Sequence, residues 1–201
     1  TVLRTGRSRQ TSAGYGLCPL HLLPEPHGDR CLRHVPSCVK WNKLVHPDVH
    51  FVFPIVKSAK GKKEVCDDYI ADWRHLVLSN PYFSLNHWLN EMGAENGQAI
   101  IYAKESDEIT RKLSLKSSEG GYKVTIVWLP EKLHEVCANK LLKLLEEPPE
   151  KTIFLLVSEA PEMILSTILS RTQRFNIRKI DEASVCLLYT SPSPRDTERS
   201  R

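Results

Sequence analysis

The sequence predicts an α/β fold built around a parallel sheet. Tyr122–Trp128 is a short run rich in β-forming residues, and Thr152–Val157 is a nearly continuous apolar run, which is typical of a strand buried on both faces. Between them, Leu133–Leu145 repeats apolar residues at helical spacing. Strand, helix and strand in this order predict a right-handed βαβ unit.

The other expected elements fit the same class. Gly120 and Gly121 interrupt the chain before the first strand of the βαβ unit, and Pro148 with Pro149 ends its helix. Upstream, the apolar patterns predict a strand over Val49–Val56 and helices over Asp67–Ser79, Pro81–Met92 (closed by Gly93) and Ser106–Leu115.

The composition is that of an ordinary globular protein with a neutral middle. The 201 residues are 41% hydrophobic and 26% charged, which excludes a disordered tail, a collagen-like repeat or a disulfide-packed toxin. Residues 1–35 hold five Arg and two acids, and residues 186–201 hold three Arg and two acids. Removing both ends from the totals of 28 basic and 24 acidic residues leaves 20 of each. The formal charge of +4 therefore comes from the ends and gives no argument for direct nucleic-acid binding.

The compartment is expected to be the cytoplasm. No apolar run approaches the roughly 18 residues that a membrane span needs, and no cleavable signal pattern follows Thr1. Six scattered cysteines are too few for a disulfide framework in a chain of this length, so reduced thiols are expected. The sequence thus predicts a soluble intracellular chain with no membrane partner.

A family resemblance rests on three segments. Ala138–Pro149 reads Ala-Asn-Lys-Leu-Leu-Lys-Leu-Leu-Glu-Glu-Pro-Pro, and it is followed by the apolar run Thr152–Val157 and by Thr-Ile-Leu-Ser-Arg at 167–171. Together these segments closely resemble the AAA+ module of bacterial DNA polymerase III clamp loaders, over about Cys38 to Ile180. The resemblance implies a partial P-loop AAA+ (RecA-like) domain with a parallel sheet and disordered ends, whose lid and collar domains are missing.

The type of subunit follows from two positions. A hydrolysing ATPase of this family needs an acidic pair at the end of the strand before the helix, for Mg²⁺ and for the attacking water. Trp128 and Leu129 stand there, and neither side chain can bind a metal or accept a proton. This loss is typical of the non-hydrolysing delta-prime subunit. An ATP-hydrolysing gamma/tau-type subunit is the alternative enzyme.

Arg171 is the candidate functional residue. Ser170-Arg171-Thr172 resembles the family's Ser-Arg-Cys motif, whose arginine reaches the γ-phosphate of ATP held by a neighbouring subunit. A permanently charged, bidentate guanidinium suits that role of a trans arginine finger. The alternative is a surface arginine at a helix end, paired with a carboxylate or carbonyls. Arg174 is expected to be structural, and Ser158 to be a strand-end hydroxyl.

A zinc site is expected in intact family members but is incomplete in this sequence. Cys38 matches the last ligand of the family's four-Cys module and is the one candidate metal ligand carried over. Cys31-x-x-His34-x-x-x-Cys38, with Cys18 distant, contains no C-x-x-C pair. No cofactor is therefore expected in this chain, and ATP is expected at a neighbouring subunit. Cys66 and Cys137 are expected to be buried or idle thiols, and a zinc nucleic-acid adaptor remains a third interpretation.

Both ends differ from the middle of the chain. Thr1–Pro36 shows no period of 2 or 3.6, so no helix or strand is expected there. Codons for Val2–Gln10 can be chosen so that the next frame encodes Phe-Cys-Gly-Pro-Glu-Gly-Val-Gly-Lys, a phosphate-binding loop, and this favours a frameshift over residues 1–35. Cys186–Asp196 can be encoded by a sequencing-adapter sequence. The expected division is an aberrant segment at 1–35, the AAA+ domain at 36–180, a linker at 181–185 and an adapter-like tail at 186–201.

These observations predict a role in DNA replication. The resemblance implies a delta-prime-like subunit that gives Arg171 to an adjacent ATP site while a sliding clamp is loaded. The implied partners are the gamma/tau and delta subunits, with the clamp and primer-template DNA reached through the assembled complex. Without the collar, the fragment is not expected to assemble.

Overall fold

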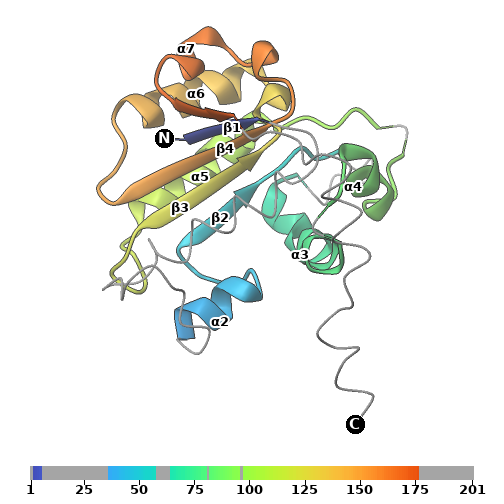
Figure 1. Cartoon of the computed structure of the whole chain (residues 1–201), viewed down its shortest axis with the longest axis horizontal. Helices are drawn as coiled ribbons and strands as arrows, with labels where there is room; N and C mark the ends of the chain where they lie inside the picture. The colour runs from blue at the N-terminus through green and yellow to red at the C-terminus, as the bar shows by residue number, and fades with distance from the viewer. Residues whose placement is uncertain (1, 6–35, 58–63, 81, 96, 177–201) are drawn as a thin grey trace, which may run out of the picture.

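The core of the fold is a five-stranded parallel sheet. The computed structural model describes residues 2–5, 36–57, 64–80, 82–95 and 97–176. The strands lie in the order β2-β3-β4-β1-β5, and every neighbouring pair runs parallel (Figure 1). Their bounds are β1 Val2–Thr5, β2 Val49–Val52, β3 Lys123–Trp128, β4 Thr152–Ser158 and β5 Gln173–Asn176. The predicted α/β class is confirmed.

Strand β3 lies deepest in the described core. All six of its residues are buried, and it pairs with β2 on one side and β4 on the other. Ile126 illustrates the register, because it lies beside Phe51 of β2 and Leu155 of β4. Burial on both faces favours an apolar strand, and Val124, Ile126, Val127 and Trp128 fit this, while Lys123 and Thr125 are buried polar residues of the same strand.

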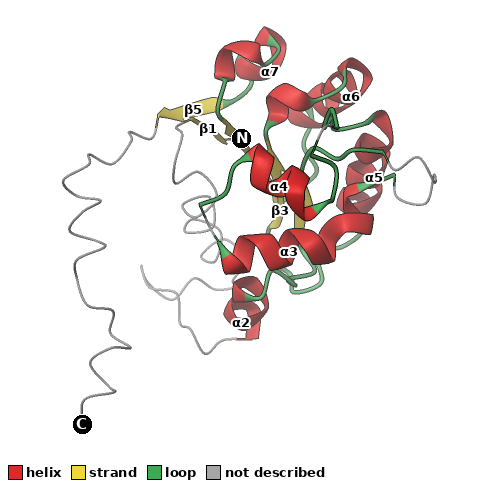
Figure 2. Cartoon of the chain, turned by 90° about the vertical axis from the view of Figure 1, so that its right-hand side faces the viewer, coloured by secondary structure: helices red, strands yellow, loops and turns green. Residues whose placement is uncertain are grey.

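Helices cover the sheet on one face and pack beyond its β2 edge. The helix α6 (Glu135–Glu146) connects β3 to β4 and confirms the predicted βαβ unit. It packs beside α5 (Ala103–Ser114), and Figures 1 and 2 show the two helices together on one face of the sheet. The helices α3 (Ile70–Ser79) and α4 (Leu85–Glu91) pack together on the β2 side, away from α7 (Ser166–Leu169).

An aromatic cluster joins the α3 and α4 region to the end of β3. The Trp73 ring of α3 stacks on Phe53 with ring centroids 4.3 Å apart. Trp88 and Phe83 each meet Trp73 edge-on at 5.3 Å, and Trp128 tilts against it at 5.2 Å. Offset and edge-on contacts of this kind add to the stabilisation that comes from burying the rings. The last residue of β3 is therefore fixed by side chains from outside the sheet.

Charged side chains order the connection into β3. The buried Asp48 carboxylate accepts hydrogen bonds from the Ser117 hydroxyl at 3.0 Å and from the Ser118 and Glu119 amides at 2.7 and 3.1 Å. The Lys123 ammonium donates to the Leu113 and Leu115 carbonyls at the end of α5. A cation at that end complements the helix dipole, and these contacts fix the chain as it enters the sheet.

The structure corrects the expectation that no strand or helix precedes Pro36. Val2–Thr5 forms β1, which lies between β4 and β5 and pairs with both. Four residues are too few to show a period, so the sheet and not the local pattern decides this strand. The frameshift hypothesis stays a prediction. Residues 6–35, the linker at 181–185 and the adapter-like tail at 186–201 lie outside the described residues.

Other differences concern element ends. The strand predicted over Val49–Val56 stops at Val52, before Pro54, which has no amide hydrogen to donate to a ladder. The predicted helix Asp67–Ser79 begins as a 3₁₀ turn, Cys66–Tyr69, before α3. The short helices α2 (Pro36–Asn42) and α7, and the strand β5, were not predicted. In the described part of the chain, no helix has the length and apolar character to cross a bilayer.

The acid stability of the fold is expected to depend on Glu119. Hydrogen bonds from Lys40 and from Ser37, both in α2, lower the pKa of its carboxyl from 4.5 to about 2, and His46 Nε2 lies 3.2 Å away. A carboxyl whose pKa is lower in the folded state stabilises the fold above pH 4.5 and loses that contribution as the pH falls towards 2. The free energy of unfolding of Glu119→Gln should therefore fall less steeply over this interval than that of the wild type.

Urea unfolding at a series of pH values measures this difference. Glu150→Gln, which removes an exposed glutamate far along the chain from α2, is the matched control. Its free energy of unfolding should change with pH as steeply as that of the wild type. Parallel pH profiles for the wild type and Glu119→Gln would contradict the role of Glu119.

Candidate functional site

The carboxyl end of β3 is filled with apolar side chains. Trp128 and Leu129 are 2% and 4% exposed, and the Trp128 ring also packs against Phe83 at 5.1 Å. Leu129 adopts a left-handed backbone conformation (φ 55°) as the chain leaves the strand, and its amide donates to the Val157 carbonyl at 2.8 Å. A hydrolysing relative is expected to have carboxylates at these two positions. In this chain both positions are part of the hydrophobic core.

A carboxylate does lie near this end of the sheet, but it is held by the protein itself. Ser158, the last residue of β4, is fully buried and donates its hydroxyl to Glu131 Oε2 at 2.8 Å. The Glu159 amide donates to Glu131 Oε1 at 3.1 Å. Ser158 thus closes the end of β4 against the 3₁₀ turn Pro130–Lys132. Glu131 was not predicted from the sequence, although its position as the first acid after β3 is a signal that could have indicated it.

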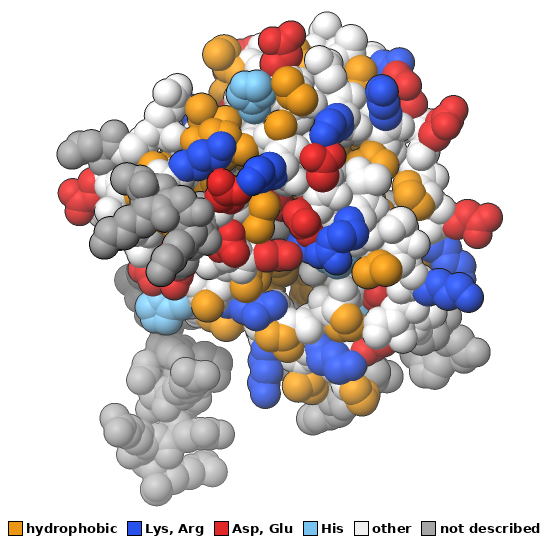
Figure 3. Space-filling model, turned by 180° about the vertical axis from the view of Figure 1, so that it is seen from behind, with side chains coloured by type: hydrophobic (Ala, Val, Ile, Leu, Met, Phe, Trp, Pro, Cys, Tyr) orange, Lys and Arg blue, Asp and Glu red, His pale blue; other side chains and the backbone are white. Residues whose placement is uncertain are grey.

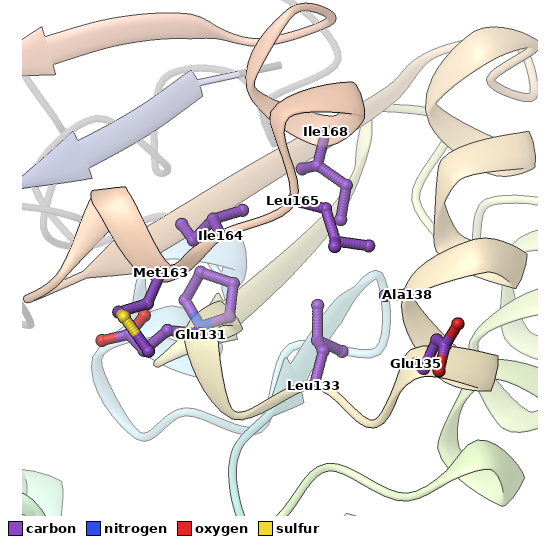
Figure 4. Close-up of a pocket in the computed structure, with 9 residues that line it drawn as sticks. Glu131, Leu133, Glu135, Ala138, Met163, Ile164, Leu165 and Ile168 are labelled. Atoms are coloured by element: carbon purple, nitrogen blue, oxygen red, sulfur yellow. The ribbon is translucent and has the colours of Figure 1, made fainter.

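A hollow of about 260 Å³ opens beside Glu131. In Figure 4, Leu133 points across this hollow towards Leu165 and Ile168, and Glu131 and Glu135 stand at its two ends. Its lining is mainly aliphatic: Pro130, Leu133, Ala138, Met163, Ile164, Leu165 and Ile168. The lining contains no cysteine, serine, threonine or histidine, and its two ionisable side chains are Glu131 and Glu135.

Arg171 lies at the protein surface directly after α7. Its Nη2 pairs with Glu146 Oε1 at 2.8 Å, and its Nη1 donates to the Thr167 carbonyl at 3.0 Å and to Ser170 Oγ at 3.3 Å. The side chains of Arg171 and Glu146 are 38% and 42% exposed. The guanidinium is therefore held in place and is also accessible from outside the chain. These contacts match the local alternative, a helix-end arginine with a carboxylate and a carbonyl.

The other arginine of this segment differs in its contacts. Arg174 is exposed on β5, and its Nε donates to Asn176 Oδ1 of the same strand at 3.2 Å. Arg174 therefore reaches along its own strand, whereas Arg171 joins α7 to the end of α6. The two residues lie three positions apart and provide a matched pair for substitution.

The described cysteines are buried. Cys38 lies inside α2 and is 1% exposed. Burial raises the pKa of the Cys66 thiol well above its ordinary value and that of Cys137 to about 11, so both stay protonated near pH 7, as expected of buried thiols. Nowhere in the described ranges do three or more His, Cys, Asp or Glu side chains gather around a possible metal ion. Cys18, Cys31 and His34 lie outside those ranges, so the role of Cys38 as a zinc ligand stays a prediction.

Comparison with known protein families decides the relationship. A family model described as "DNA polymerase III, delta subunit" matches residues 20–181. The chain belongs to this family. The match includes both the buried end of β3 and the Ser170-Arg171 motif, and curated relatives named delta' support a delta-prime-like member of the clamp-loader family.

The relatives of this chain include both delta' and tau subunits. It is 42% identical over 97 residues to DNA polymerase III subunit delta' of Yersinia pestis, a match that covers 47% of this chain and 28% of the relative. It is 30% identical over 150 residues to delta' of Haemophilus influenzae, covering 75% and 33% of the two chains. DNA polymerase III subunit tau of Bacillus subtilis is 40% identical over 81 residues, covering 40% and 14%. The chain thus spans a third or less of the length of these relatives.

A solved structure supports the fold of this family member. The crystal structure of a DNA polymerase III gamma subunit-related protein from Thermotoga maritima superimposes with a TM-score of 0.53 at 17% identity. The alignment covers 98% of this chain and 47% of that protein. At this identity the likeness concerns the fold alone, and it agrees with the predicted AAA+ architecture.

Placing a carboxylate at the end of β3 is expected to destabilise the folded state of the protein. Trp128→Asp would remove a ring that packs on Trp73 and Phe83 and would bury a charge without a partner. We expect the free energy of unfolding to fall by about 3–5 kcal/mol. Urea unfolding measures the loss, and Leu115→Asp, at a position that is 58% exposed, should change it by about 0.5 kcal/mol or less. Equal stability of the two variants would contradict the core role of Trp128.

Proposed function

We propose that the chain acts as a non-hydrolysing, delta-prime-like subunit of a DNA polymerase III clamp loader that supplies Arg171 to an ATP site on a neighbouring subunit. The observation that carries the proposal is the contrast between the buried Trp128 and the accessible Arg171. The chain lacks the acids of an ATPase at the end of β3 and presents a cation at its surface.

The proposed absence of hydrolysis is supported by the chemistry of the residues at the end of β3. Phosphoryl transfer to water needs a carboxylate for Mg²⁺ and a group that orients the water. The Trp128 ring and the Leu129 side chain supply neither group, and both are packed in the core. The carboxylate of Glu131, in the turn after β3, already accepts hydrogen bonds from the Ser158 hydroxyl and the Glu159 amide. ATP is expected at a neighbouring subunit and not at this chain.

The contacts and the exposure of Arg171 suit a role at an ATP site on another subunit. A finger arginine must be stiff enough to be positioned and exposed enough to reach another chain. The Thr167 carbonyl and the Ser170 hydroxyl hold one edge of the guanidinium, while more than a third of the side chain faces solvent. Arginine keeps its charge at all physiological pH values and can bind two phosphate oxygens at once.

The expected partners are those of an assembled loader. ATP-hydrolysing gamma/tau subunits and the delta subunit would contact the chain, and the sliding clamp and primer-template DNA would be reached through the ring. Acidic and basic side chains intermix on the face shown in Figure 3, in agreement with a neutral middle segment. Net charge therefore supplies little attraction to DNA. Replication in the bacterial cytoplasm is the proposed setting.

The match to subunit tau favours one alternative, an ATP-hydrolysing gamma/tau-type subunit. Mg²⁺-dependent ATP hydrolysis by the full-length protein that contains this chain, purified alone, distinguishes the two functions. We expect none above the background of a preparation without the protein. A turnover that requires Mg²⁺ would favour the alternative.

Replacing Arg171 is the direct test of the trans role. In the full-length protein assembled with its loader partners, Arg171→Ala should leave folding intact and lower DNA-stimulated ATP hydrolysis. Loss of a trans arginine slows hydrolysis at the ATP site it serves by about 10³-fold or more. The total hydrolysis rate of the loader should therefore fall by at least the part that this one site contributes. Arg174→Ala is the matched control and should keep the wild-type rate. Unchanged hydrolysis by Arg171→Ala would contradict the proposed role.

A further inference from the structure

We propose that Glu146 is a positioning residue that holds Arg171 in reserve until a neighbouring subunit presents a phosphate. This inference rests on the proposed function, because it describes how the trans arginine would be regulated. In the isolated chain the Glu146 carboxylate forms an ion pair with the Arg171 guanidinium. In the assembled ring the phosphate oxygens of ATP replace that carboxylate.

The geometry separates the two edges of the guanidinium. Nη1 is bound by the Thr167 carbonyl and Ser170 Oγ, which belong to the same turn as Arg171. Nη2 is bound by Glu146, which comes from another helix, α6. The local contacts fix the base of the side chain, and the Glu146 contact decides where its charged end points. Breaking the Glu146 contact alone frees one edge while the anchor on α7 remains.

The strength of the contact fits an exchangeable partner. Both side chains are more than a third exposed, and ion pairs at such sites contribute little because water and salt screen them. A phosphate carries more negative charge than a carboxylate and can accept two parallel hydrogen bonds from arginine. A neighbouring ATP can therefore compete for Arg171, whereas in its absence the pair with Glu146 persists.

The position of Glu146 points to a role beyond its own helix. It is the last residue of α6, where the helix dipole disfavours a negative charge. A cation beside it offsets that cost, and Arg171, which directly follows α7, provides one. The neighbouring Glu147 has the same charge at the same helix end, but its side chain makes no ion pair or hydrogen bond with the described residues. The two glutamates therefore form a matched pair.

The test uses the full-length protein in the reconstituted loader, with ATP hydrolysis measured without and with primer-template DNA and clamp. Glu146→Gln removes the charge and keeps the shape. We expect the rate without DNA to rise about threefold to fivefold, the size that an exposed ion pair can contribute. The stimulated rate should stay within about twofold of the wild type. Glu147→Gln should match the wild type in both conditions, and Glu146→Asp, which keeps the carboxylate, should keep the unstimulated rate near the wild-type value.

A double variant shows whether Glu146 acts through Arg171. If it does, Glu146→Gln combined with Arg171→Ala should have the same rates as Arg171→Ala alone. Unchanged rates for Glu146→Gln, while Arg171→Ala lowers hydrolysis, would overturn the reserve role and leave the arginine finger standing. A lower unstimulated rate for Glu146→Gln, or an effect that persists in the double variant, would make Glu146 structural and also overturn it. Wild-type hydrolysis by Arg171→Ala would overturn the proposed function itself.

Discussion

The packing of Trp128 against Trp73 and Phe83 is the contact that joins the end of β3 to the α3 and α4 region. It ends β3 inside an aromatic cluster, so the chain must turn sharply at Leu129 before it can enter α6. Helix α6 then runs back over the sheet to Glu146, beside the end of α7. The Trp128 packing thus lies at the start of the segment that leads through α6 to the Glu146–Arg171 ion pair.

This arrangement separates a rigid part of the chain from an exposed part. Strand β3 is fully buried and held on both sides, and Ser158 with Glu131 ties the end of β4 to the turn after β3. Arg171 directly follows a four-residue helix at the surface and contacts α6 through an ion pair with Glu146. In the proposed function, the buried sheet is the base from which Arg171 would be presented to another chain.

The sequence predicted the elements whose residues are buried by their own pattern. β3, α6 and β4 were recognised because apolar runs and helical spacing reflect burial on the sheet. β1 and β5 were missed because each has four residues, and a strand that short is decided by the neighbours that pair with it. At the candidate site, Arg171 was found through its motif. Its partner Glu146 was not, because nothing in the residues between them shows that the two helix ends meet.

Residue identity places Trp128 and Leu129 where the family resemblance expects the acids of a hydrolysing relative, and it supplies the Ser170-Arg171 motif. Which side chains meet depends on the tertiary structure. Glu146 and Arg171 are 25 positions apart, and they meet because the parallel register of β3 and β4 returns the chain beside α6. Local propensity cannot encode such a contact, since its energy arises only after the sheet has brought distant segments together.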